Sequence, residues 1–150
     1  MQTDRDHAVK VLNGLIERTL DSVNGYKEAA EHIENQGYRT LFAERASARM
    51  ELTRRLQDEV RSFGGMPKDD QSLVGRAHNA FVGVKEAISP DSDRSVIDEV
   101  ERGEDVLKGQ FEKAVEDRDL PPQVQSLISG LYQSVKTDHD TISRIKHELH

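Results

Sequence analysis

The sequence predicts an all-α protein in which four long helices form a bundle and a fifth, shorter helix lies in the connection between the second and the third. Apolar residues recur at alternating steps of three and four along most of the chain, which places them on one face of a helix. The composition is 33% charged and 35% apolar, without Trp and with only four Pro. Such a composition suits long helices with one narrow buried face and a broad solvated face.

Two helices are expected in the first part of the chain, over residues 4–35 and 38–63. The buried stripe of the first helix consists of Val9, Leu12, Ile16, Thr19, Val23, Tyr26, Ala30 and Ile33. The stripe of the second consists of Phe42, Ala46, Arg49, Leu52, Leu56, Val60 and Phe63. Gly37 is expected to end the first helix, and Gly64 and Gly65 to end the second. Because the connection is short, the two helices form an antiparallel hairpin.

A second hairpin is expected over residues 92–117 and 121–149. The buried stripe of its first helix consists of Ile97, Val100, Glu104, Leu107, Phe111 and Ala114. The last helix buries Val124, Ile128, Leu131, Val135, Asp138, Ile142, Ile145 and Leu149. Two hairpins joined by one long crossover are the connectivity of ferritin-like folds, whereas a simple up-and-down bundle has three short loops. A chain of 150 residues fits one such domain, over residues 1–150.

The long crossover contains the fifth predicted helix, over residues 71–89. Its apolar stripe repeats the spacing of the long helices and consists of Val74, Ala77, Phe81, Val84 and Ile88. This stripe is too long to leave in water. We therefore expect it to cover a seam of the bundle or to build a homodimer interface.

Charge and composition exclude several classes of function. The net charge is −7, whereas a nucleic-acid-binding protein needs a clustered positive field, so we expect no nucleic-acid partner. The chain has no Cys, and it therefore has no thiolate metal site and no thiol nucleophile. No segment approaches the roughly 20 apolar residues of a membrane span. We expect a cytoplasmic protein that does not contact a membrane.

Near its midpoint each of the four long stripes is interrupted by a polar residue. These residues are Thr19, Arg49, Glu104 and Asp138. Antiparallel packing brings the four midpoints to one level of the bundle, which is the level where a four-helix bundle can hold a pair of metal ions. The sequence therefore predicts one buried polar layer with a cation, two carboxylates and a hydroxyl.

The residues of this layer do not match a di-iron centre. Ferritin-like di-iron sites take a Glu from each of two helices and a Glu-x-x-His pair from each of the other two. Only Glu104 and Asp138 supply a ligand here, because the remaining positions hold Thr19, Arg49, Leu52 and Val135. Arg49 also adds a permanent positive charge that repels a dication. We expect no metal and no other cofactor in the layer.

Two interpretations of the layer remain open. In the first, Arg49 is held in an ion-pair network by Glu104, Asp138 or both, and Thr19 donates a hydrogen bond; the paired carboxylates then have lowered pKa values. In the second, a single divalent metal ion is bound by Glu104 and Asp138 with help from Glu101 or His139.

Four stretches of the chain carry a resemblance to a known family: LNGLIERTLDSVNGYKEAAE, FGGMP, EVERGED and VKTDHDTISRI. The chain resembles bacterial ferritin-like four-helix-bundle proteins described only as a domain of unknown function. The resemblance covers nearly the whole chain and implies a ferritin-like fold and a cytoplasmic bacterial protein, sometimes associated with stress responses. It implies no catalytic residues.

No constellation of catalytic residues is present in the sequence. A Ser/His/Asp set, a phosphate-binding Gly-rich loop and an HExxH motif are all missing. We therefore expect a non-enzymatic structural or interaction protein with a degenerate metal site. The alternative is a metal-binding or iron-oxidising protein that uses Glu104, Asp138 and their neighbours.

Overall fold

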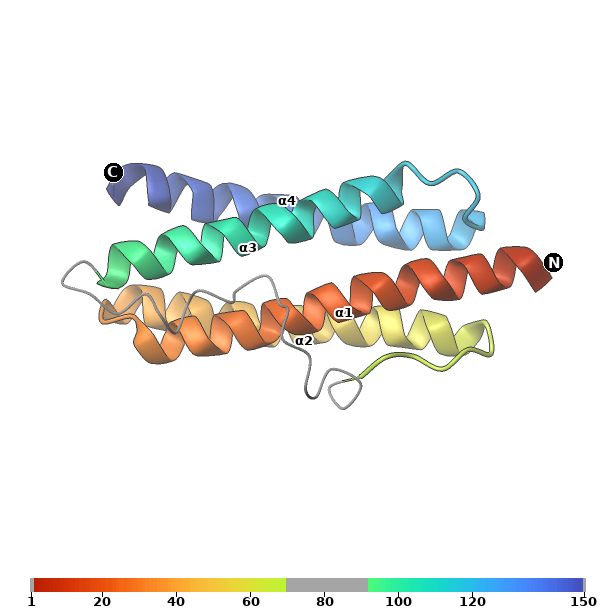
Figure 1. The fold of residues 1–150 in the computed structure, drawn as a ribbon, viewed down its shortest axis with the longest axis horizontal. Coiled ribbons are helices and arrows are strands. Elements are labelled where there is room, and N and C mark those ends of the chain that lie inside the picture. Colours follow the sequence, from red (N-terminus) through yellow and green to blue (C-terminus); the bar gives the residue numbers. More distant parts are fainter. Residues whose placement is uncertain (1, 70–91, 150) are drawn as a thin grey trace.

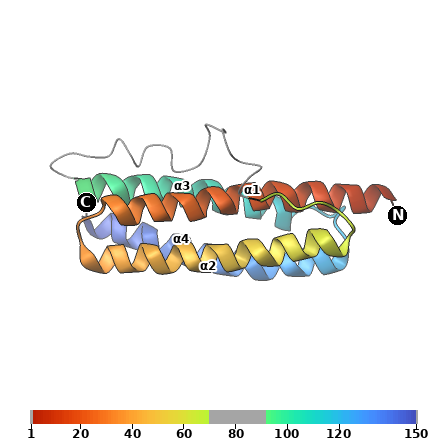
Figure 2. The same ribbon diagram turned by 90° about the horizontal axis from the view of Figure 1, so that it is seen from below.

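In a computed structural model, which describes residues 2–69 and 92–149, the chain forms four α-helices. They are α1 (Gln2–His32), α2 (Gln36–Ser62), α3 (Ser92–Val115) and α4 (Pro122–Leu149). Figure 1 shows two antiparallel hairpins, α1 with α2 and α3 with α4, that lie along each other to form a bundle. The helices α2 and α3 run in the same direction, so the end of α2 and the start of α3 lie at opposite ends of the bundle. In Figure 2, α1 and α3 form one layer and α2 and α4 the other.

The turn between α1 and α2 lies earlier than the sequence suggests. The first helix ends at His32, and Gly37 does not end it but lies in the first turn of α2. The break is made by Asn35, whose side chain accepts a hydrogen bond from the backbone N–H of Tyr38 at 3.0 Å. A short polar side chain that caps the first turn in this way stabilises a helix start. The capping asparagine therefore decides the boundary here, and the glycine does not.

Two successive glycines explain the end of α2 in the FGGMP stretch. Gly64 has a φ of 76°, a left-handed conformation that favours glycine after a helix. Gly65 lies so close to α1 that an added Cβ would stand 2.9 Å from a methyl group of Val9. The chain beyond it is held on α1 by Asn13, which donates to the carbonyl of Met66 and accepts from the backbone N–H of Lys68.

The predicted crossover helix over residues 71–89, and with it the predicted homodimer interface, lies outside the described residues. None of the described helices contains a stretch long and apolar enough to cross a membrane.

The apolar core of the described residues falls into two clusters along the bundle. The larger cluster includes Leu12, Leu15, Ile16, Leu20, Leu56, Leu107, Phe111, Val124 and Ile128. The other includes Tyr26, Ile33, Phe42, Ile97, Val100 and Ile142. Between them lie buried polar side chains, among them Thr19, Ser22, Arg49, Thr53 and Glu104. The positions at which the apolar stripes are interrupted therefore mark the place where the core itself is divided.

Candidate functional site

Arg49 is the largest side chain that is fully buried among the described residues. It projects from the middle of α2 into the bundle, where its guanidinium group meets the carboxylate of Glu104 from α3. Nη1 donates to Oε1 at 2.7 Å and Nη2 donates to Oε2 at 2.8 Å. Glu104 is itself completely buried. Two parallel hydrogen bonds between a planar guanidinium and a carboxylate give the strongest and most directional form of an ion pair.

The other two helices complete the surroundings of the guanidinium group. Nη1 of Arg49 also donates to Oγ of Ser22 in α1 at 2.6 Å, and Nη2 donates to Oδ2 of Asp138 in α4 at 3.2 Å. The second oxygen of Asp138 lies 3.0 Å from Nη1 of Arg45, one turn earlier in α2. Two arginines thus face two carboxylates, and the layer is balanced in formal charge. Arg49 contacts every helix of the bundle.

Thr19 lies in the same layer but does not bond to the guanidinium group. Its hydroxyl donates to the carbonyl of Ile16 at 3.0 Å and accepts from Thr53 of α2 at 2.8 Å. The expected hydrogen bond to Arg49 comes instead from Ser22, one turn further along α1. A long arginine side chain extends along its helix, so its polar end meets a different turn from the one opposite its Cα.

Tyr26 packs against the same guanidinium group from the side of α1. The Cζ atom of Arg49 lies 5.6 Å from the centre of the phenol ring, within the range of a cation–π interaction. Burial first, and then the neighbouring Glu104 carboxylate, raise the pKa of the Tyr26 phenol well above its usual value. Burial has the largest single effect and acts to lower the pKa of Arg49, but the charge and hydrogen bonds of Glu104, together with Tyr26 and Asp138, outweigh it and raise this pKa. Tyr26 is therefore neutral and Arg49 is charged at every physiological pH.

The pKa of Asp138 does not follow the prediction for a paired carboxylate. We expected Arg49 to lower it, but burial raises it, and the charges of Arg49 and Arg45 offset this effect only in part. Asp138 is the least enclosed carboxylate of the layer, with 23% of its side chain exposed. Its 3.2 Å contact with Arg49 is also longer than the contacts of Glu104.

A second group of polar residues lies beside the layer, where α3 and α4 meet at the surface. Nε2 of His139 lies 2.5 Å from an oxygen of Asp105 and 3.9 Å from an oxygen of Glu101. Its Nδ1 lies 3.2 Å from Asp140. Partial burial acts to lower the pKa of His139, but its hydrogen bonds to Asp105 and Asp140 raise it. One imidazole and two carboxylates converge here, a ligand set that proteins use for transition metals.

The four residues considered as metal ligands therefore fall into two separate sets. Glu104 and Asp138 face inward, and both are bonded to Arg49. Glu101 and His139 lie together with Asp105 in the outer group. Among the described residues a further group of this kind is formed by His7, Asp117 and Asp119.

Sequence reasoning missed four residues of these two sites. Ser22 and Thr53 lie one turn from the interrupted stripe positions, on the buried side of their helices. Arg45 precedes Arg49 by one turn of α2, and Asp105 follows Glu101 by one turn of α3. Polar residues at i±3 and i±4 from each interruption share its helix face, and a search for them would have found Ser22, Arg45 and Thr53. It would not have found Asp105, which follows the interruption Glu104 directly.

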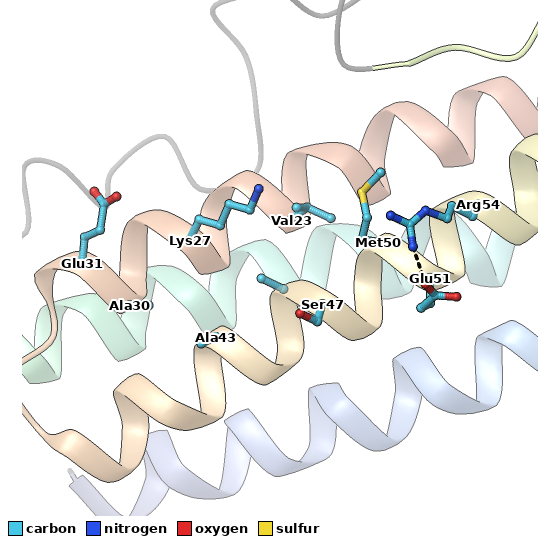
Figure 3. Close-up of a pocket in the computed structure, with 10 residues that line it drawn as sticks. Val23, Lys27, Ala30, Glu31, Ala43, Ser47, Met50, Glu51 and Arg54 are labelled. Carbon is cyan, nitrogen blue, oxygen red and sulfur yellow. Dashed lines mark hydrogen bonds and ion pairs between the residues drawn. The ribbon is translucent and has the colours of Figure 1, made fainter.

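A shallow groove lies on the other hairpin, between α1 and α2 (Figure 3). It has a volume of about 570 Å³ and contains no residue of the ion-pair layer. Its floor includes small side chains such as Ala43 and Ser47, and charged side chains including Lys27, Glu31 and Arg54 stand at its edges. In Figure 3, Arg54 turns toward Glu51 of its own helix, with which it forms an ion pair.

A family model described as a domain of unknown function (DUF2383) matches residues 7–117. The chain belongs to this family. The matched segment contains both arginines and Glu104, whereas Asp138 and His139 follow it. None of the curated proteins matches the chain.

The fold is that of a ferritin-like four-helix bundle. A solved structure of a Dps1 mutant from Mycobacterium smegmatis aligns with a TM-score of 0.83 and covers 97% of this chain and 99% of that chain. The two sequences are only 9% identical. At this level of identity the similarity shows the fold alone.

Proposed function

We propose that this protein is a non-enzymatic structural or interaction protein, in which a buried ion-pair layer takes the place of the dinuclear metal centre of a ferritin-like bundle. The observation that carries this proposal is the paired contact between Arg49 and Glu104, with distances of 2.7 and 2.8 Å. A metal at this level would need the Glu104 oxygens, and both accept hydrogen bonds from Arg49. A guanidinium group cannot release its charge at physiological pH to make room for a cation.

The second candidate is a metal-binding or iron-oxidising protein that uses Glu104, Asp138 and their neighbours. It is less well supported, because both carboxylates are bonded to Arg49. Two irons about 3.5–4 Å apart also need bridging carboxylates and terminal ligands from all four helices. At the equivalent positions α1 offers Thr19 and α4 offers Val135.

Iron loading separates these two functions. The untagged protein, freed of metal by a chelator, is titrated with ferrous iron in air. We expect no absorption band of an oxo-bridged iron pair, because the layer offers two carboxylates and two guanidinium groups. Two tightly bound irons per chain, with a band that Glu104→Gln abolishes, would show that the layer is a metal centre.

The expectations about binding partners remain predictions. The net charge of −7 argues against nucleic acid, whose phosphates need a clustered positive surface. The apolar stripe over residues 71–89 is the segment we propose for self-association or for covering a seam. A cytoplasmic role connected with stress is what the family resemblance implies.

A further inference from the structure

The outer group on α3 and α4 has the features of a metal site that is separate from the ion-pair layer. Glu101 and Asp105 are four residues apart, so they lie one above the other on the same face of α3. His139 comes from the antiparallel helix α4 and directs Nε2 toward both. The ligand atoms of all three residues lie within 4.8 Å of one another.

We propose that Glu101, Asp105 and His139 bind one divalent transition-metal ion of the zinc class, with water in the remaining position. This inference goes beyond the proposed function, because it involves no residue of the ion-pair layer.

The distances fit such an ion after small movements. With metal–ligand bonds of about 2.0–2.2 Å, the ligand atoms of a tetrahedral zinc site lie roughly 3.3–3.5 Å apart. The distances from Nε2 of His139 to Asp105 and Glu101 are 2.5 and 3.9 Å, one shorter and one longer than this separation. Asp105 is 57% exposed and free to turn outward. The side chains of Glu101 and His139, only 13% and 14% exposed, are held by packing.

Neighbouring groups hold two of the three ligands, Glu101 and His139, in orientation. Lys146 lies 3.3 Å from Oε1 of Glu101, which leaves Oε2 facing the imidazole. Asp140 contacts Nδ1 of His139 through Oδ1, while Lys136 lies 3.3 Å from its Oδ2. A carboxylate behind a histidine fixes the ring so that the opposite nitrogen faces the metal, and proteins commonly support metal-binding histidines in this way.

The ligand types decide which class of cation fits. One imidazole with two carboxylates suits zinc and neighbouring first-row dications, whereas calcium and magnesium prefer oxygen ligands alone. Three protein ligands leave one position open to water. Cobalt(II) is therefore the probe of choice. Its visible absorption reports how the bound ion is coordinated, and zinc can then be added to displace it.

The experiment is a titration of the untagged, metal-free protein with cobalt(II), followed by its absorption spectrum and by calorimetry, and then competition with zinc. We expect one ion per chain. Asp105→Asn removes an exposed ligand without endangering the fold and should weaken binding at least tenfold, as should His139→Gln. Asp140→Asn, which removes the supporting carboxylate, should weaken it about 10–100-fold.

Two matched controls show where the ion lies. His147→Gln changes an exposed histidine two turns further along α4, and His7→Gln breaks the group with Asp117 and Asp119. Binding should be unchanged in both. Loss of binding in either control, full binding in His139→Gln, or no binding to the wild type would overturn the proposal. Arg49→Met changes the ion-pair layer but none of these ligands, so it should leave this ion in place. A failure of the metal-site proposal is therefore distinguishable from a failure of the proposed function.

Discussion

A guanidinium group without access to water must find its hydrogen-bond acceptors inside the protein, and Arg49 finds four. They are Oγ of Ser22, both carboxylate oxygens of Glu104 and one oxygen of Asp138. A buried ion pair of this kind adds little net stability compared with a well-packed apolar pair, because both charges leave water. Once formed, however, it makes the removal of either partner costly. The arrangement therefore favours one register of the helices over others.

Tyr26 should make the free energy of unfolding depend on pH in the alkaline range. Its phenol is buried beside Glu104, and its pKa lies well above the usual value. In the unfolded chain the phenol loses its proton near pH 10, while the folded protein retains it. Above about pH 10 the free energy of unfolding should therefore fall by about 1.4 kcal/mol for each pH unit from this group alone.

The variant Tyr26→Phe lacks this group and tests the effect. Denaturant unfolding of both proteins at several pH values between about 9 and 12 isolates it, because other alkaline effects are shared. The wild type should lose its stability more steeply than the variant above about pH 10. Equal slopes would mean that the Tyr26 phenol ionises in the folded protein and is not enclosed beside Glu104.

The spacing of residues predicted part of this site and missed part of it. Helix geometry is regular, so a polar interruption in each stripe was enough to indicate that Arg49, Glu104 and Asp138 lie at one level. It could not indicate that Ser22 replaces Thr19 as the partner, because that depends on how far the arginine extends along the bundle. The raised pKa of Asp138 also escaped prediction, because spacing indicates that a residue is buried but not whether burial or the charges of Arg49 and Arg45 have the larger effect on its pKa.

At the scale of single elements, the helix ends depend on caps and close contacts more than on the periodic pattern. Asp93 of α3 accepts hydrogen bonds from the backbone N–H groups of Glu34 and Asn35, at 2.7 and 2.9 Å. The turn of the first hairpin is thereby held on the start of the second. The four helices could be predicted from periodicity, whereas this contact joins residues far apart in the chain and leaves no local signal.

Two glycines in different elements should respond in opposite ways to the same substitution. In Gly65→Ala the new methyl group would stand 2.9 Å from Val9 and 3.1 Å from Val60, and overpacking of this kind costs about 1–3 kcal/mol. In Gly130→Ala, within α4, the methyl group meets nothing within 4 Å. Alanine stabilises a helix interior by about 0.5–1 kcal/mol relative to glycine.

Thermal or denaturant unfolding of the two variants checks this contrast. Gly65→Ala should be less stable than the parent and Gly130→Ala more stable. If Gly65→Ala were neutral, the segment after α2 would not pack against α1 as closely as described. A loss of stability in Gly130→Ala would place that face of α4 in a contact.

At the scale of the whole molecule, the layer joins the two hairpins. Arg45 and Arg49 belong to the first hairpin, and Glu104 and Asp138 belong to the second. The ion pairs Arg49–Glu104, Arg49–Asp138 and Arg45–Asp138 all cross from one hairpin to the other. Sliding one hairpin by a turn would separate these pairs, so we expect the layer to favour a single alignment. The Dps1 mutant shares this four-helix fold at 9% identity.

The central claim is that Arg49 and Glu104 form an ion pair with each other and do not bind a metal ion. It is tested by a double-mutant cycle with Arg49→Met and Glu104→Gln, measured as free energies of unfolding at pH 7. Arg49→Met keeps most of the volume but leaves a buried carboxylate without its partner, and should cost about 3–5 kcal/mol. Arg55→Met, which changes an exposed arginine of the same helix, should alter stability by no more than about 0.5 kcal/mol.

The double variant decides the question. With Glu104 neutral, the loss of Arg49 strands much less charge, so Arg49→Met/Glu104→Gln should be clearly more stable than the sum of the two single changes allows. We predict a coupling free energy of about 2–3 kcal/mol. Costs that simply add, to within about 0.5 kcal/mol, would contradict the account, because Arg49 and Glu104 would then not depend on each other.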